Sequence, residues 1–175
     1  MIAIFVDADA CPVKDEVYGV AARYDLRVFV VANALMRVPP GAGAELVVVG
    51  RDFDAADDWI AANARGGDVV VTADILLAAR CLESGARVIG TDGRPFTEES
   101  IGGALASRAL NQELRERGVL GGGGPRPLSE KDRSRFASRL DQLVVAGMRE
   151  VAGSRCVMSF PRRRRCAHSL TQRAR

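Results

Sequence analysis

The sequence predicts an α/β protein, a three-layer α/β/α sandwich in which a mainly parallel five-stranded sheet is covered by helices on both faces. Two observations predict this class. Short apolar runs alternate with helical segments of about 10–15 residues, as in parallel sheets. The runs are almost continuously apolar, which is typical of strands buried on both faces. With 175 residues, 47% of them hydrophobic, the chain can bury one core.

Each element has its own signal. The strands are expected at 2–6, 26–31, 45–49, 68–72 and 86–90, and the helices at 12–23, 54–64, 75–84, 97–117 and 129–146. Pro12 suits the first turn of the first helix, and Glu98 and Glu99 suit the positive first turn of the fourth. Ser129 with Asp132 forms a capping-box-like start for the last helix. Prolines and glycines predict irregular loops over 32–44 and 118–127.

Charge divides the chain into a body, 1–150, and a tail, 151–175. The body holds all 22 acidic residues, whereas the tail holds seven arginines and no acidic residue. We expect the body to form one domain and the tail to be disordered, because its scattered apolar residues cannot support a core. Truncation after Gly147 would then leave the melting temperature nearly unchanged. The run 162–165, four arginines, would add salt-sensitive affinity for RNA.

Cysteine spacing and hydropathy indicate the compartment. The four cysteines are not paired in spacing, which argues against a disulfide framework and for a reducing environment. The first apolar run stops at Asp7 and lacks a basic start, so it is not a signal peptide. No stretch reaches the length of a membrane span. We expect a soluble, cytoplasmic protein that does not associate with membranes.

Carboxylates follow three of the expected strands. Asp7 and Asp9 end the first strand, Asp74 follows the fourth, and Asp92 follows the fifth. Ligands of open parallel sheets bind at the carboxyl ends of the strands. Carboxylates that converge there repel one another, and a divalent cation removes the conflict. Since Mg²⁺ and Mn²⁺ favour carboxylate and water ligands, the sequence predicts a magnesium or manganese site.

Structural roles compete with this interpretation. Asp74 could cap the helix that begins at Ile75, and Asp54 could cap the preceding helix with Asp57 as its reciprocal partner. Asp92, within "TDGRP", is also an ordinary turn residue. Asp7 fits a structural role least well, because it lies at the inner end of a buried strand.

Five blocks of sequence resemble the YaiI/YqxD family of bacterial proteins of unknown function. They are "IFVDADACPVK", "ANALMRVP", "DAADDWI", "VVTADILLAARCLESGA" and "GGGGP", in family order over about residues 1–147. That family is similar to PIN-like nucleases, and the resemblance implies the strand order 3-2-1-4-5. The tail 151–175 has no counterpart in the family pattern.

The resemblance implies roles for individual residues. Asp7, Asp57 in "DDWIAA" and Asp74 in "TAD" match the acidic positions of PIN nucleases and would be catalytic and metal-binding. Asp92 resembles a fourth acid, and Asp9 would replace a glutamate that many PIN enzymes carry. The expected substrate contacts are Lys14, Asn33 of "ANALMRVP" and Arg108.

Three functions remain open. The first is a metal-dependent nuclease, acting on RNA, that activates a water for attack on a phosphodiester. The second is a haloacid-dehalogenase-like phosphatase with Asp7 as nucleophile and Asp9 as acid/base. The third is a nucleic-acid-binding protein without activity. Cys11 as a nucleophile is less favoured, because the only histidine, His168, lies in the tail. The glycines of 121–125 fit a linker better than a phosphate loop.

Overall fold

A six-stranded sheet forms the centre of the computed structural model, which describes residues 2–9, 11–39, 43–50, 52, 54–116 and 127–157. Its strand order is β3-β2-β1-β4-β5-β6. The strands are β1 (Ala3–Asp7), β2 (Arg27–Ala32), β3 (Ala44–Val48), β4 (Val69–Val71), β5 (Arg87–Ile89) and β6 (Pro95–Phe96). The helices are α1 (Lys14–Arg23), α2 (Ala55–Asn63), α3 (Ile75–Glu83), α4 (Glu98–Glu116) and α5 (Glu130–Val157).

The first five strands are parallel and confirm the predicted order. Val6 of β1, for example, pairs with Val30 of β2 and with Val71 of β4. The sixth strand is an addition that the sequence did not indicate. It is two residues long and antiparallel to β5. A tight turn produces it, in which the Gly90 amide donates to the Arg94 carbonyl at 2.8 Å.

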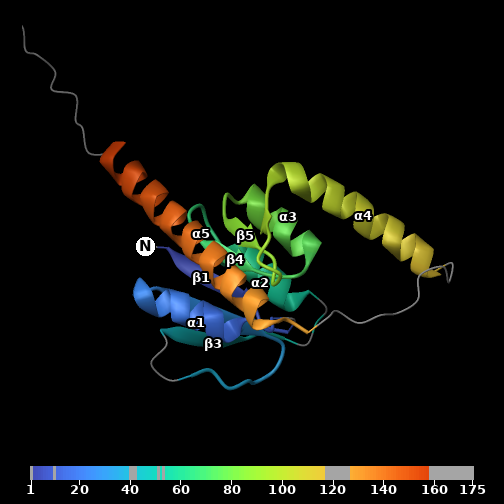
Figure 1. Ribbon diagram of the computed structural model, residues 1–175, viewed down its shortest axis with the longest axis horizontal. Coiled ribbons are helices and arrows are strands. Elements are labelled where there is room, and N and C mark those ends of the chain that lie inside the picture. Colours follow the sequence, from blue (N-terminus) through green and yellow to red (C-terminus); the bar gives the residue numbers. More distant parts are fainter. Residues whose placement is uncertain are drawn as a thin grey trace, which may run out of the picture.

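Helices cover both faces of the sheet, as predicted (Figure 1). Along β1, Ile4 and Val6 point to the face covered by α1 and α5, whereas Phe5 points to the face covered by α2 and α3. Burial on both faces explains why the strands read as continuous apolar runs. No helix in the described part of the chain is long and apolar enough to cross a membrane.

The last helix begins as predicted but is longer. Ser129 and Asp132 form the expected cap: the Asp132 amide donates to Ser129 Oγ at 3.2 Å and the Ser129 amide to Asp132 Oδ2 at 3.1 Å. We expected the helix to end near Ala146, but it continues to Val157. The disorder expected from residue 151 therefore does not hold for 151–157, and residues 158–175 lie outside the described part of the chain.

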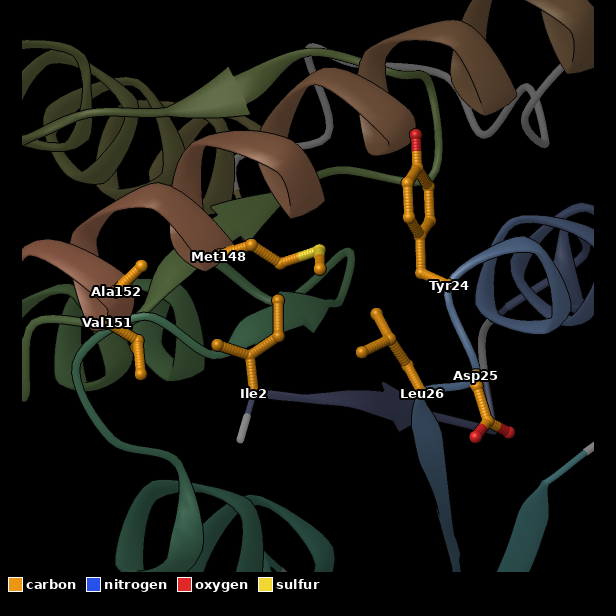
Figure 2. A pocket seen from close by; sticks show the side chains of 7 residues that line it. All are labelled: Ile2, Tyr24, Asp25, Leu26, Met148, Val151 and Ala152. Carbon is orange, nitrogen blue, oxygen red and sulfur yellow. The ribbon is translucent and has the colours of Figure 1, made fainter.

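The added turns of α5 pack on the body. A Cβ on Gly147 would collide with the carbonyl oxygen of Gly67, so only glycine allows this approach. Arg87 donates two hydrogen bonds to Glu150, at 2.7 and 2.8 Å. Met148 and Val151 line a cavity of about 360 Å³ together with Ile2, at the start of β1 (Figure 2). Residues beyond Ala146 are thus part of the folded domain.

Candidate functional site

An acidic hollow lies at the carboxyl edge of the sheet, at the opposite end of β1 from the apolar cavity of Figure 2. Its volume is about 340 Å³. We call it the acidic hollow, and its lining residues are Asp7, Asp9, Asn33, Asp52, Asp54, Ala56 and Asp57. These residues come from the ends of β1 and β2 and from the start of α2 with the loop before it. The hollow lies where the sequence predicted a site, beyond the carboxyl ends of parallel strands.

Asp7 is the most deeply placed carboxylate, with 8% of its surface exposed. Burial raises its pKa, while hydrogen bonds from the Thr72 side chain and from the backbone of Asp9 lower it. The Thr72 hydroxyl donates to Asp7 Oδ2 at 2.9 Å. The charges of Asp9 and Asp74 raise the pKa further. A buried carboxylate with one hydroxyl donor and two acidic neighbours has a strong electrostatic reason to gain a proton or a cation.

Asp57 is perturbed more strongly, with its pKa raised to about 6. Burial is the main cause, followed by the negative charges of Asp7, Asp74 and Asp54. Asp57 also lines the acidic hollow together with Asp7. Its neighbour Asp58 points elsewhere, since it forms an ion pair with Arg80 at 2.8 Å on the exposed surface.

The cap considered for Asp54 and Asp57 is not observed. Asp54 precedes α2, but its side chain makes no capping hydrogen bond. Its backbone is left-handed, with φ of 67°, a conformation that is uncommon outside glycine but that aspartate adopts more readily than most residues. The cap interpretation is therefore wrong for this pair, and both side chains line the acidic hollow instead.

Asp74 does cap its helix. Its Oδ1 accepts hydrogen bonds from the amides of Leu76 at 2.6 Å and Leu77 at 3.4 Å. The same oxygen forms an ion pair with Arg108 at 3.0 Å. Asp74 does not line the acidic hollow, although its charge acts on both Asp7 and Asp57. Asp74 is therefore a helix cap whose negative charge also acts on the hollow.

Asn33 contributes a polar atom with no partner. Its side-chain oxygen, Oδ1, is buried and accepts no hydrogen bond within the described part of the protein. A buried acceptor without a donor is unfavourable unless a ligand or a water satisfies it. Since Asn33 lines the acidic hollow, the expected place of such a partner is the hollow itself.

Of the other residues expected at the site, Asp9 and Lys14 lie at or near the acidic hollow, whereas Asp92 does not. Asp9 is exposed and lines the hollow. Lys14 donates from Nζ to the carbonyl of Ala8 at 2.9 Å, which places one positive charge near the two aspartates of the first strand end. Asp92 lies elsewhere, in a turn where it accepts from the Arg94 amide at 3.0 Å. It lines a separate hollow that contains Arg94.

Two acidic residues of the hollow were not identified from the sequence. Asp52 and Asp54 lie in the irregular segment before α2, not at a strand end. The signal was present, because the segment "DFDAADD" holds four acids in seven residues. Cys11 is buried and its pKa is raised to about 11, so its thiol is protonated at neutral pH. The glycines of 121–125 lie outside the described residues.

As they lie, these side chains are not gathered around one point. Among the described residues, no three His, Cys, Asp or Glu side chains are grouped tightly enough to hold a metal ion. Their influence on one another is electrostatic, as the pKa of Asp57 demonstrates.

The titration of Asp57 predicts a pH-dependent stability. The pKa of an aspartate in an unfolded chain is about 3.9. Because the folded state holds this proton more tightly, the free energy of unfolding should fall as pH rises from about 4 to about 6. Asp57→Asn cannot ionise and escapes this loss. Without divalent cations, the free energy of unfolding of the mutant minus that of the wild type should increase from about pH 4 to about pH 6 and stay constant at higher pH. Thermal unfolding at several pH values measures this difference. A difference that does not vary with pH would contradict the assignment.

Fold and hollow together define a class: a mostly parallel α/β sheet with carboxylates gathered at the carboxyl ends of its strands. The chain belongs to the YaiI/YqxD family, because residues 5–146 match the family profile described as "Uncharacterized BCR, YaiI/YqxD family". The resemblance that the sequence blocks indicated is therefore confirmed.

Curated relatives agree with this assignment. The chain is 58% identical over 149 residues to a UPF0178 protein of Rhodospirillum centenum, covering 83% of this chain and 97% of the relative. A UPF0178 protein of Bradyrhizobium diazoefficiens is 56% identical over 141 residues, 81% of this chain and 84% of the relative. One of a Caulobacter species is 51% identical over 151 residues, 86% and 99% of the two chains. No solved structure matches the chain significantly.

Proposed function

We propose that the protein is a divalent-cation-dependent phosphodiesterase that hydrolyses RNA. The observation that carries this proposal is a hollow lined by carboxylates from β1 and α2, with the charge of a third acid acting on it. Asp7 at the end of β1 and Asp57 in α2 line one hollow, and the charge of Asp74, before α3, acts on both. Carboxylates placed in this way repel one another, and a bound cation would convert the repulsion into attraction.

The donor atoms around the hollow suit Mg²⁺ or Mn²⁺. Every polar lining side chain offers oxygen, and Asn33 Oδ1 is buried without a partner among the described residues. Mg²⁺ keeps several waters and binds through one or two carboxylates rather than a full protein cage. Asp7 and Asp57 would therefore hold the ion, with Asn33 as a neutral ligand and Asp9 and Asp74 as nearby negative charge. A tight group of three acidic side chains is not required.

The chain's own residues would support hydrolysis of a phosphodiester. A bound cation would lower the pKa of a coordinated water and offset the charge of the phosphate. Burial and the charges of neighbouring acids raise the pKa of Asp57 to about 6 without a cation, and a cation held there would keep its carboxylate ionised at neutral pH. The hydrogen bond from Thr72 fixes the orientation of the Asp7 carboxylate. Lys14 places a positive charge beside the strand end, where a substrate phosphate would meet it.

RNA is the proposed substrate for two reasons. The acidic positions resemble those of PIN-like nucleases, as the sequence blocks indicate. The chain also carries four consecutive arginines at 162–165, and arginines of this kind add salt-dependent affinity for a phosphate backbone.

The phosphatase alternative is less well supported. A nucleophilic Asp7 must be ionised, but burial raises its pKa and Thr72 occupies one of its two oxygens. Cleavage of p-nitrophenyl phosphate in preference to an RNA oligonucleotide would favour the phosphatase. Cation binding without cleavage of either substrate would favour a non-catalytic RNA-binding protein.

Thermal unfolding with and without cation tests the site. Millimolar Mn²⁺ or Mg²⁺ should raise the melting temperature, because a ligand at 100 times its Kd stabilises the folded state by about 2.7 kcal/mol. Asp7→Asn should weaken this response. The same mutant should be more stable than the wild type without cation, since it lacks one of the repelling charges. If wild type and mutant respond to the cation alike, Asp7 does not bind it.

A further inference from the structure

The ion pair between Arg108 and Asp74 joins α4 to the start of α3, close enough to the acidic hollow for the charge of Asp74 to act on Asp7 and Asp57. We infer that Arg108 offsets the negative charge of Asp74 and so weakens cation binding in the hollow, and that it releases Asp74 when a substrate phosphate binds the guanidinium, so that cation and substrate strengthen each other's binding. This inference rests on the proposed function and adds a coupling between its two ligands.

The contacts of Asp74 indicate that Arg108 can leave it without disturbing its structural role. Its Oδ1 accepts hydrogen bonds from two amides at the start of α3 and one from Arg108 Nη1 at 3.0 Å. The two amide bonds keep Asp74 in place as the helix cap when Arg108 turns away. While it is paired, Arg108 offsets the negative charge that Asp74 contributes near the hollow, and its positive charge repels a cation there.

The position of Arg108 allows it to leave. The side chains of Arg108 and Asp74 are 42% and 33% exposed, and ion pairs in such positions are weak. The start of α4 is fixed, since Thr97 and Ser100 cap each other and Ile101 packs against the core. Arg108 lies about two turns further along α4, a helix that extends beyond the body of the protein (Figure 1). Its guanidinium can turn to a phosphate without disturbing that anchor.

A phosphate is the natural competitor for this guanidinium. Arginine binds phosphate through two parallel hydrogen bonds, whereas only one contact joins Arg108 to Asp74. When a phosphate takes the guanidinium, the charge of Asp74 is no longer compensated and the affinity for a cation rises. By linkage, the bound cation increases the affinity for the phosphate by the same factor.

Calorimetric titration of the full chain with Mn²⁺ tests the inference. Arg108→Gln should bind Mn²⁺ about fivefold more tightly than the wild type, at the lower end of typical coupling. A phosphorothioate RNA decamer should bind this variant more weakly, and Mn²⁺ should no longer strengthen its binding. The variant should thus bind Mn²⁺ more tightly and the RNA more weakly. A purely structural role of Arg108 would instead predict weaker binding of both.

Arg27→Gln is the matched control. Arg27 also forms an exposed ion pair with an acidic residue, Glu45, at 2.8 Å, but it lies at the start of β2, at the opposite end of the strand from the hollow. The Mn²⁺ affinity of this variant should change much less. Mn²⁺ binding that is equal or weaker in Arg108→Gln overturns the inference while leaving the proposed function intact. If the wild type binds no Mn²⁺, the proposed function fails, and the inference fails with it.

Discussion

Asp57→Asn is expected to abolish phosphodiester cleavage while the fold survives. Asparagine keeps the size of the side chain but removes its negative charge, which interacts with the charges of Asp7 and Asp74. Losing an outer partner of a metal site typically costs 10- to 100-fold, so losing a direct ligand should cost at least about 100-fold. Cleavage of a labelled RNA in Mn²⁺, with circular dichroism as a check on folding, measures this effect.

Asp58→Asn is the internal control. The two residues are adjacent on α2, yet Asp58 is exposed and paired with Arg80, and such surface pairs contribute at most about 1 kcal/mol to stability. Its activity should be close to that of the wild type. An equal loss of activity in both mutants, or in neither, would show that Asp57 does not hold the cation.

Truncation after Gly147 should destabilise the protein, contrary to the expectation from the sequence. It removes Val151, which packs against the core, and Glu150, which accepts two hydrogen bonds from Arg87. The loss of this packing should cost about 2 kcal/mol. For a chain of this size, the melting temperature would fall by about 4–8 °C.

Truncation after Val157 separates this effect from that of the tail. This variant keeps every described contact of α5 and lacks only 158–175, which the composition predicts to be disordered. It should melt close to the full chain. If both truncations melt like the full chain, the last turns of α5 contribute nothing to stability. If both melt several degrees lower, the predicted disorder of 158–175 is wrong.

The parallel sheet could be predicted from sequence because its first five strands are largely apolar runs, four of which, β1, β2, β4 and β5, contribute buried residues to both faces. Strand β6 could not, because two residues carry no periodicity and its pairing depends on the preceding turn. The length of α5 was underestimated because Gly147 reads as a helix end. In the structure, that glycine instead permits contact with Gly67.

The candidate site divides in a similar way. Asp7 and Asp57 could be identified because a carboxylate after a buried strand and one within "DDWIAA" form a recognisable pattern. Asp54 was harder to identify, because the acid-rich segment "DFDAADD" does not show which of its acids the local backbone brings to the hollow. Asp92 also follows a strand, but the turn that creates β6 directs it to Arg94 instead. Local loop geometry, not strand order, determines which acids reach the hollow.

The most direct test of a cation in the acidic hollow is an anomalous difference map from crystals grown with Mn²⁺. The account predicts a peak in contact with the carboxylates of Asp7 and Asp57, beside Asn33 Oδ1, and its loss in crystals of Asp7→Asn. A hollow without a peak at millimolar Mn²⁺, or a peak bound only by residues elsewhere, would contradict it.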